Sequence, residues 1–329
     1  MTYTNNPDLH TFKQDWKGTP IDDNNCFVNH EFPFTTHLGD VFKWLTGDKP
    51  QKQEKKSDTF RLTTTDDASF LRDKKDCIVW LGHASFFIRL GGISVLIDPV
   101  FYNVPLVKRY AQHAFSPEVF TQLDYLLISH DHQDHCQEKS IRKIINQNPN
   151  VEILTGLNMI GLLRPWIKNN KVQCAGWYQQ YKTSSDLAIY YLPSRHWSKR
   201  GMTDTNKRLW GAYVVQSKKI TIYFSGDTGY GSHFIEAKEL FPSIDVAIIG
   251  VGAYKPEWFM SPNHISPTHS VTAFHELGAK VFIPMHYGTF DISDEPVGEP
   301  YRILKQLESE NKINGKLKTM NLGECFDVY

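Results

Sequence analysis

Short apolar runs separated by turns follow one another from residue 77 onward and predict a domain rich in strands. The runs 77–81, 85–90 and 93–98 are apolar or alternating, and Gly91 and Gly92 make a turn between the last two, which predicts a β-meander. Further strands are predicted at 124–129, 151–155, 187–193, 209–216, 219–227, 245–250 and 280–286.

Apolar residues at helical spacing lie between many of these strands. Helices are predicted at 138–148, 157–167, 232–241, 268–278 and 301–311. Strands dominate the first part of the domain, whereas helices and strands alternate in its last third. This order predicts an α+β protein in which mixed sheets are covered by helices on their outer faces.

Residues 1–76 differ from the rest because they are rich in polar and aromatic side chains. We therefore divide the chain into an N-terminal extension, 1–76, packed on a main domain, 77–329. The extension contains an apolar stripe at i, i+3, i+4, i+7 spacing, formed by Leu38, Val41, Phe42 and Leu45. We expect this stripe to pack against the main domain and residues 51–58 to be an exposed linker.

The overall composition narrows the class of protein. The 36 Lys and Arg residues balance 36 Asp and Glu residues, whereas nucleic-acid binders usually carry a basic excess. The five cysteines are odd in number and lack CxxC spacing, which indicates reduced thiols. No apolar run approaches the roughly 20 residues of a membrane span. We expect a cytoplasmic protein that binds no nucleic acid.

The segment SHDHQDHC, residues 129–136, is the strongest chemical signal in the sequence. It follows a predicted strand, so side chains two and four residues apart leave that strand on the same side. His130, His132 and Asp134 have this spacing, and His135 turns toward a neighbouring position. Clustered imidazoles and carboxylates are costly to bury without partners, and divalent metals remove that cost. The segment therefore predicts metal ligands.

Three further candidate ligands stand at the ends of predicted strands: His196, Asp227 and His286. Strand ends open toward a shared face, so we expect these residues to join the motif. We predict one metal held by His130, His132 and His196, a second held by Asp134, His135 and His286, and Asp227 bridging the two. Histidine and aspartate without thiolate suit two zinc ions, while manganese or iron stays open.

Other residues near the motif are assigned supporting roles. Asp98 ends a predicted strand and is expected to accept a hydrogen bond from a ligand imidazole. His83 either acts in a similar way or is satisfied within the core. His264 lies on a loop just before a helix, where it is expected to stabilise an oxyanion. Asp134, Asp227 and His264 are the predicted catalytic residues.

Taken in order, HDHQDH, a lone histidine, GDTG and a final histidine at a strand end resemble the metallo-β-lactamase superfamily. This resemblance covers residues 77 to about 323 and implies an αββα sandwich with a binuclear metal site at one edge. The segments WLGHAS (80–85), LIDPVF (96–101), FSGDTGY (224–230) and MHYGTF (285–290) are similar to the N-acylphosphatidylethanolamine-hydrolysing phospholipase D family. The N-terminal extension also resembles that family.

The second resemblance implies a zinc-dependent phosphodiesterase that yields phosphatidate and an N-acylethanolamine. It implies that the seven predicted ligands hold two zinc ions, which activate a bridging hydroxide, and that His264 lies at the active site. Animal members carry an aromatic residue where this chain has Gln133. Gln133, Lys199 and Arg200 are the predicted substrate-binding residues, and a solvated basic loop is the alternative for the last two.

Other functions stay open at this point. A lactonase or other carboxyl-ester hydrolase would direct the same hydroxide to a carbonyl group, a nuclease would cleave another phosphodiester, and a non-enzymatic protein would only bind metal. We expect a small-molecule or phospholipid substrate, and we keep peripheral membrane contact and a homodimer as hypotheses. Membrane contact rests on aromatic residues of the extension: Phe32, Phe34, Phe42 and Trp44.

Overall fold

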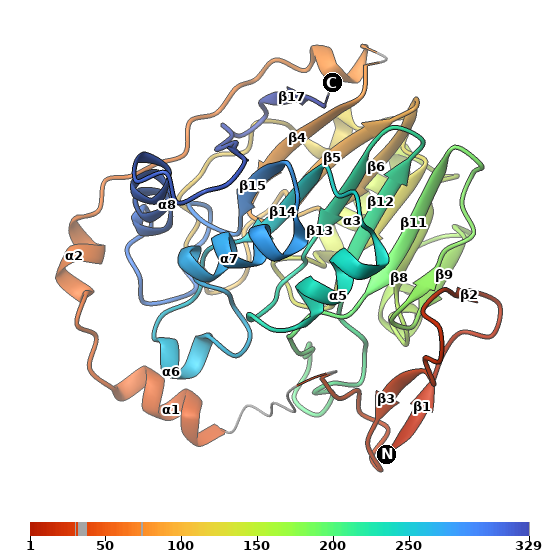
Figure 1. Ribbon diagram of the computed structural model, residues 1–329, viewed down its shortest axis with the longest axis horizontal. Coiled ribbons are helices and arrows are strands. Elements are labelled where there is room, and N and C mark those ends of the chain that lie inside the picture. The colour runs from red at the N-terminus through yellow and green to blue at the C-terminus, as the bar shows by residue number, and fades with distance from the viewer. Residues whose placement is uncertain (30, 32–37, 74, 329) are drawn as a thin grey trace.

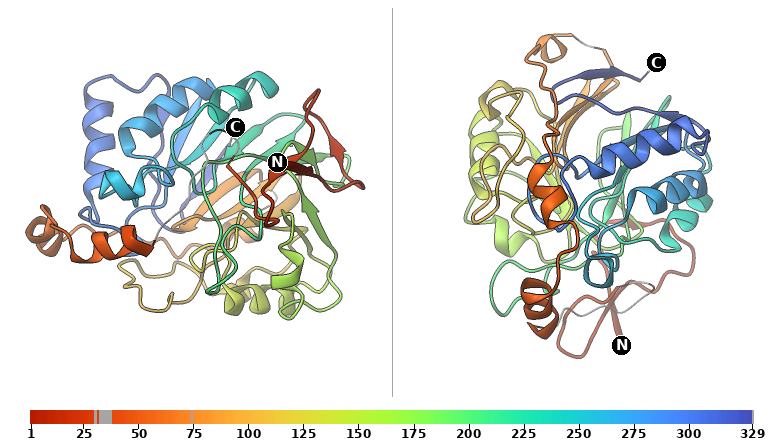
Figure 2. Two further views of the ribbon diagram at one scale, coloured as in Figure 1. Left: turned by 90° about the horizontal axis from the view of Figure 1, so that it is seen from below. Right: turned by 90° about the vertical axis from the view of Figure 1, so that its left-hand side faces the viewer.

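Two mixed β-sheets face each other at the centre of the computed structural model, which describes residues 1–29, 31, 38–73 and 75–328. Helices cover the outer faces of the sheets (Figures 1 and 2). The predicted αββα sandwich is therefore confirmed. One sheet has seven strands, in the order β17 (Cys325–Asp327), β4 (Cys77–Gly82), β5 (Ser85–Leu90), β6 (Ile93–Ile97), β7 (Tyr125–Ile128), β8 (Glu152–Gly156) and β9 (Val172–Ala175).

The other sheet has eight strands. Their order is β16 (Lys316–Leu317), β15 (Val281–Met285), β14 (Val246–Gly250), β13 (Thr221–Phe224), β12 (Ala212–Ser217), β11 (Leu187–Leu192), β10 (Gln179–Gln180) and β2 (His10–Thr11). Each predicted strand overlaps an observed one. The short strands β9, β10, β16 and β2 were not predicted, because runs of two to four residues carry too little periodicity.

Four of the predicted helices are confirmed with small shifts at their ends. They are α3 (Glu138–Gln147), α5 (His233–Leu240), α7 (Pro267–Leu277) and α8 (Glu299–Ser309). The predicted helix 157–167 is wrong over most of its length, since only α4 (Ile160–Leu163) forms. Pro165 has no N–H to donate and its ring clashes with the preceding turn, so the helix cannot continue through it.

Two hydrophobic layers hold the sandwich together. Successive residues of β4 point to opposite faces, so Ile78 and Trp80 lie in the core between the sheets, while Val79 lies in an outer layer. Ile141 and Ile144 of α3 belong to the same outer layer. The strands are therefore apolar on both faces, which explains why their sequences read as continuous apolar runs.

Strand direction places the chemistry at one edge. In the seven-stranded sheet β4, β6 and β7 run in one direction. In the eight-stranded sheet β11, β13, β14 and β15 share a direction. The loops after the carboxyl ends of these strands carry the candidate site residues.

The N-terminal extension contacts the main domain at separate places. Its strand β2 pairs with β10, and Trp44 of α1 (Leu38–Thr46) stacks on Phe259 of α6 (Glu257–Met260), with ring centroids 5.4 Å apart. The expectation that the α1 stripe packs inward is wrong for Phe42 and Leu45, which are 68% and 63% exposed. Phe32 and Phe34 lie outside the described residues. The domain boundary at residue 76 stays a prediction.

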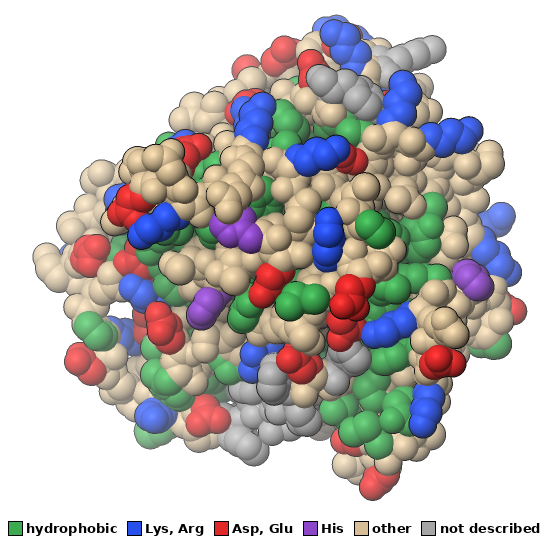
Figure 3. Space-filling model, in the orientation of Figure 1, with side chains coloured by type: hydrophobic (Ala, Val, Ile, Leu, Met, Phe, Trp, Pro, Cys, Tyr) green, Lys and Arg blue, Asp and Glu red, His purple; other side chains and the backbone are tan. Residues whose placement is uncertain are grey.

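A small sheet and a helix also belong to the extension. Strands β1 (Thr2–Thr4) and β3 (Thr19–Ile21) form a small separate sheet, and α2 (Lys52–Ser57) follows α1. On the face shown in Figure 3, basic and acidic side chains are interspersed. Within the described part of the chain, no helix has both the length and the apolar composition needed to cross a bilayer.

Candidate metal centre

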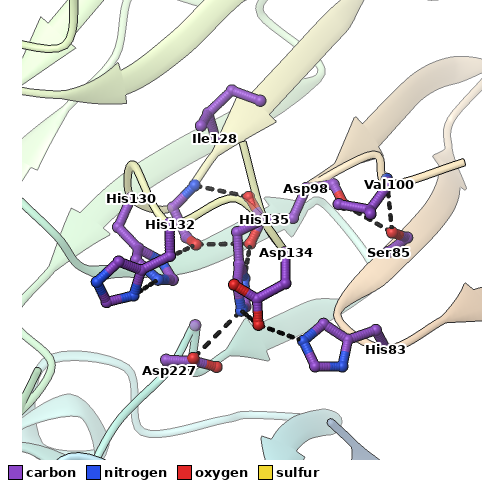
Figure 4. A network of polar contacts seen from close by, with 12 residues as sticks. His83, Ser85, Asp98, Val100, Ile128, His130, His132, Asp134, His135 and Asp227 are labelled. Atoms are coloured by element: carbon purple, nitrogen blue, oxygen red, sulfur yellow. Dashed lines mark hydrogen bonds and ion pairs between the residues drawn. The ribbon is translucent and has the colours of Figure 1, made fainter. Parts of the chain in front are cut away.

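Loops at the strand ends bring the seven predicted ligands together at one edge of the sandwich. Figure 4 labels the motif residues and Asp227. The motif residues follow β7, and His196 comes four residues after β11. Asp227 comes three residues after β13, and His286 directly follows β15. His135 and His196 are fully buried, whereas the side chain of Asp134 remains 19% exposed.

One cluster consists of three histidines. Nδ1 of His132 lies 3.0 Å from Nε2 of His130 and 3.1 Å from Nε2 of His196. The ligand atoms that the three side chains offer all lie within 4.8 Å of one another. Three imidazole nitrogens converging in this way, with no thiolate, resemble the protein ligands of a catalytic zinc site.

The second cluster surrounds Asp227. Nε2 of His135 lies 3.2 Å from Oδ2 of Asp227, and Nε2 of His286 lies 3.1 Å from Oδ1. Oδ2 of Asp134 is 3.9 Å from each of these two nitrogens. Oδ2 of Asp227 is also 3.8 Å from Nε2 of His196. Asp227 therefore stands between the two clusters.

The hydrogen bonding of these residues fits a metal site. Nε2 of His135 and Nε2 of His286 are buried, and although each lies close to Asp227, neither makes a contact with hydrogen-bond geometry in the described structure. Unpaired polar atoms are costly to bury. Coordination to a divalent cation would satisfy both nitrogens and both carboxylates, so the residues present fit a binuclear centre.

The protonation states also suit metal binding. Burial lowers the pKa of His130 and of His196 well below the usual histidine range. Burial opposes ionisation of Asp134 and Asp227, but neighbouring histidines outweigh it and hold the pKa of each carboxyl well below its usual value. Neutral imidazoles and ionised carboxylates are the forms that bind metals.

The carboxylates around His135 favour a positive charge at this place in the site. Burial alone would lower its pKa, yet the adjacent carboxylates of Asp227 and Asp98 raise the pKa well above the usual value. A cation among these groups would meet the same carboxylates.

Several imidazoles are oriented by hydrogen bonds at the ring nitrogen that points away from the ligand clusters. Nδ1 of His135 lies 2.9 Å from Oδ2 of Asp98, a buried carboxylate that also accepts from Ser129 N at 2.7 Å. Nδ1 of His196 lies 3.1 Å from the carbonyl oxygen of Asn263. Such contacts leave the other ring nitrogen to face the metal.

His83 contacts two predicted ligands at once. Its Nε2 lies 2.9 Å from Oδ2 of Asp134, and its carbonyl oxygen accepts from His286 N at 3.1 Å. Burial, followed by the nearby His286 ring, lowers the pKa of His83 to about 3, so the ring is neutral and Nε2 can donate to Asp134.

Several residues of the site have left-handed backbone. His83, Asp98 and His286 have φ values of 53°, 42° and 66°, which non-glycine residues rarely adopt. Gly226 also has a left-handed φ of 56°, and a Cβ there would lie 2.6 Å from the Gly211 carbonyl oxygen. Functional sites often hold residues in such strained conformations, although Asp15, Asn158 and Asn311 have positive φ elsewhere in the described chain.

A cavity of about 430 Å³ opens beside the clusters. His132, Asp134, Asp227 and His264 line it together with Lys199. The rest of its lining is mainly apolar: Val41, Trp44, Val104, Pro105, Val107, Trp197, Ala253, Phe259, Met260 and Ile292. The cavity therefore presents polar metal-binding groups and a broad apolar wall to the same ligand.

The three predicted substrate-binding residues lie in different places. Gln133 and Lys199 line the cavity. Arg200 does not line it, because its Nη1 donates to the carbonyl oxygens of Asp131 at 2.9 Å and Cys136 at 2.7 Å. The guanidinium of Arg200 therefore holds the backbone of the motif.

His264, predicted to be catalytic, lies in the cavity beside Asp227. Its Nδ1 is 3.8 Å from Oδ2 of Asp227, and its side chain is 16% exposed. Burial lowers the pKa of His264 to about 4, so the ring is neutral at pH 7 and can donate one hydrogen bond.

Sequence reasoning missed several residues that support the site. Buried Asp131 pairs with Arg208, Nε to Oδ2 at 2.7 Å, and Trp197 packs its ring 4.8 Å from that of His132. Asp131 stands between two histidines in the sequence, and strand alternation turns its side chain away from theirs. This spacing could have predicted that Asp131 supports the motif and does not bind metal. Asn29, which bonds to the backbone of His196, had no local signal.

Known proteins share this pattern. A family model described as "Beta-lactamase superfamily domain" matches residues 94–287, a range that holds all seven predicted ligands. The N-acyl-phosphatidylethanolamine-hydrolyzing phospholipase D 1 of Caenorhabditis elegans is 31% identical over 270 residues, covering 76% of this chain and 75% of the worm protein. A UPF0173 metal-dependent hydrolase of Caldivirga maquilingensis is 28% identical over 228 residues, or 69% of this chain and 88% of that protein.

A solved structure agrees with the architecture. Igni18, a metallo hydrolase from the archaeon Ignicoccus hospitalis, matches with a TM-score of 0.60 at 20% sequence identity. The match covers 77% of this chain and 97% of that chain. The likeness shows a shared fold.

Proposed function

Because this chain belongs to the metallo-β-lactamase superfamily and is a metal-dependent hydrolase, we propose that it is a zinc-dependent phosphodiesterase of the phospholipase D type. We propose N-acylphosphatidylethanolamine-like lipids as its substrates. Support comes from the worm relative, whose name describes that reaction, and from a ligand set of histidine and aspartate, which suits zinc.

The observation that carries the proposal is the two-sided lining of the cavity. Metal-binding side chains and Lys199 provide charge, while Trp44, Phe259 and neighbouring residues provide a wide apolar surface. A lipid phosphodiester has the same division, since its phosphate is anionic and its acyl chains are apolar. Pockets that combine a few polar groups with apolar walls orient ligands in this way.

Different residues of the chain have different roles in the proposed hydrolysis. Two bound zinc ions would supply an activated water and polarise a phosphoryl oxygen. Lys199 attracts the phosphate, and neutral His264 donates a hydrogen bond to oxygen as negative charge develops there. Asp134, which faces the cavity and is held by His83, accepts the proton of the attacking water.

The proposed reaction breaks one bond and forms one. The water oxygen bonds to phosphorus, and the bond between phosphorus and the oxygen of the N-acylethanolamine breaks. The proton taken up by Asp134 passes to the leaving oxygen. The products are phosphatidate and an N-acylethanolamine.

The test is direct. Zinc-loaded protein is incubated with N-acylphosphatidylethanolamine in mixed micelles, and the products are identified by mass spectrometry. Asp227→Asn, which removes a charge from between the clusters, is expected to be inactive. Asp245→Asn is the matched control, because Asp245 lies at the opposite end of β14 and bonds to Lys280.

The same assay is run on an acyl lactone and on DNA. Phosphatidate and N-acylethanolamine from the parent and from Asp245→Asn, but not from Asp227→Asn, support the proposal. Hydrolysis of the lactone or the DNA alone, by protein that holds two metals, would replace it with a carboxyl-ester hydrolase or a nuclease.

We also propose that the substrate is taken from a lipid surface. Exposed apolar side chains adjoin residues that line the cavity: Phe42 and Leu45 on α1, Leu106 in the loop 104–107, and Trp258 on α6. The double variant Phe42→Ser, Leu106→Ser is expected to lose binding to phospholipid vesicles and to keep its activity on a soluble phosphodiester. Unchanged vesicle binding would remove this part of the proposal.

A further inference from the structure

The backbone of His196 needs support that no sheet supplies. His196 lies outside the helices and strands, four residues beyond the end of β11, yet it is fully buried. A buried peptide group must pair both its N–H and its carbonyl oxygen. The neighbouring residue Arg195 is held by the loop that carries Asp227, since Arg195 N donates to Thr228 Oγ1 and Gly229 N donates to the Arg195 carbonyl oxygen.

Asn29 pairs both backbone groups of His196. Its Nδ2 donates to the His196 carbonyl oxygen at 2.8 Å, and its Oδ1 accepts from His196 N at 3.1 Å. The side chain of Asn29 is therefore used at both ends, as a strand partner would be. Asn29 is only 5% exposed, so water does not readily replace either bond.

The segment before Asn29 is fixed to the main domain. Phe27 is 2% exposed and belongs to the largest hydrophobic cluster of the main domain, and its N–H donates to the Asn206 carbonyl oxygen at 2.7 Å. Asn206 in turn accepts from Ser198 N through Oδ1 at 3.1 Å. Residues 27–29 thus run along the loop that carries His196.

We propose that Asn29 is a positioning residue of the metal centre, through which the N-terminal extension sets the place of the ligand His196. Asn29 fixes the backbone, the carbonyl oxygen of Asn263 fixes the ring at Nδ1, and Nε2 is left to face His130 and His132. The proposal rests on the predicted ligand set of the metal centre and is independent of the substrate.

The expected effect is selective. Asn29 touches one ligand of the histidine cluster, whereas Asp134, His135 and His286 are held by other groups. Loss of Asn29 should weaken binding of the metal at the histidine cluster and leave the other metal in place. Removing such an orienting contact typically costs about 10- to 100-fold in metal affinity.

Zinc affinity and stoichiometry test the proposal without an activity assay. Parent, Asn29→Ala and Asn29→Asp proteins are titrated with zinc against a chromophoric chelator, and thermal unfolding of the metal-free proteins is recorded. Asn29→Asp keeps the volume of the side chain but turns an oxygen toward the His196 carbonyl oxygen. Asn148→Ala is the matched control, because Asn148 is equally buried and bonds to Gln122 N, Leu123 N and the Phe120 carbonyl oxygen, away from the motif.

Each outcome of the titration either supports or overturns the role of Asn29. We expect both Asn29 variants to keep one tight zinc and to bind the second about 10- to 100-fold more weakly, while Asn148→Ala is less stable but binds two zinc ions as the parent does. Two zinc ions bound with parental affinity by Asn29→Asp, or an equal loss at both sites, would overturn the proposal. If Asn29→Ala does not fold, Asn29→Asp decides alone. A parent that binds no zinc would instead overturn the assignment of zinc to the centre.

Discussion

At the scale of single residues, the position of the His286 backbone requires that residue 252 has no side chain. A Cβ on Gly252 would lie 2.0 Å from the His286 carbonyl oxygen, closer than any real contact. We expect Gly252→Ala to displace His286, to reduce zinc binding and to lower the free energy of unfolding by about 1–3 kcal/mol. Metal analysis after dialysis and thermal unfolding measure both effects.

Gly250→Ala provides the control for this prediction. A Cβ on Gly250 would meet the Cβ of His286 at 3.8 Å, which is an ordinary contact. We expect this variant to retain two metals. Parental metal content in Gly252→Ala would show that the loop moves without cost and would contradict the prediction.

The residues of the site differ in how far the sequence predicts them. The motif ligands are predictable because their spacing combines the alternation of a strand with an unusual density of metal-binding side chains. Asn29 and His196 are 167 residues apart, and a side chain that bonds to a distant backbone leaves no periodic pattern. Arg200 could be predicted to lie near the site, but its bonds to two carbonyl oxygens depend on how the loop folds back.

At the scale of elements, α1 forms part of the cavity. Trp44 lines it, stacks on Phe259 and donates through Nε1 to Asp294 at 3.0 Å. We expect Trp44→Ala to raise KM several-fold for a long-chain lipid and to leave kcat for a small soluble phosphodiester unchanged. Thr46→Ala, an exposed polar residue of the same helix that does not line the cavity, is the control, and equal changes with both substrates would contradict the prediction.

Asp58, the residue after α2, attaches the N-terminal extension to the main domain. Residues 51–58 were expected to be an exposed linker. None of them is fully buried, as expected, but residues 52–57 form α2. Asp58 accepts from Phe60 N and Gly298 N at 2.9 Å and pairs with Arg302 at 3.0 Å. Burial alone would raise the pKa of Asp58, yet these bonds outweigh it and lower the pKa. The ionised carboxylate therefore stabilises the fold at neutral pH.

This anchor predicts a dependence on pH. A lowered pKa gives stability that is present above the unfolded-state pKa, near 4, and is lost as the pH falls through the folded-state pKa. We expect Asp58→Asn to cost about 1 kcal/mol at pH 7, and less as the medium becomes more acidic. Denaturant unfolding at several pH values measures this. Asp186→Asn, at an exposed pair with Lys218, should change little, and a constant cost for Asp58→Asn would contradict the prediction.

Comparison of predicted and observed elements shows which sequence patterns predict secondary structure correctly. Strands were predicted well because they are buried on both faces and read as apolar runs. The predicted helix 157–167 failed at Pro165, where backbone chemistry overrides periodicity. The α1 stripe was misread because periodicity predicts a helix and its apolar side, but not what covers that side.

At the scale of the whole molecule, the metal centre joins the two sheets. The motif follows β7 of one sheet, while His196, Asp227 and His286 follow strands of the other. Zinc that binds only the folded protein should stabilise it, by about 4 kcal/mol when its concentration is 1,000 times the dissociation constant. We expect a chelator to lower Tm by several degrees in the parent and by less in Asp227→Asn. Equal Tm values with and without zinc would contradict a metal that joins the sheets.

The bond between Asn29 and His196 also has a consequence in time. A ribosome that adds roughly 5–20 residues per second needs about 10–30 s to travel from one residue to the other. During that interval the oldest part of the nascent chain waits for a partner that has not been made. Asn29 can therefore settle only after His196 has emerged, and a complete ligand set exists only once His286 has left the ribosome.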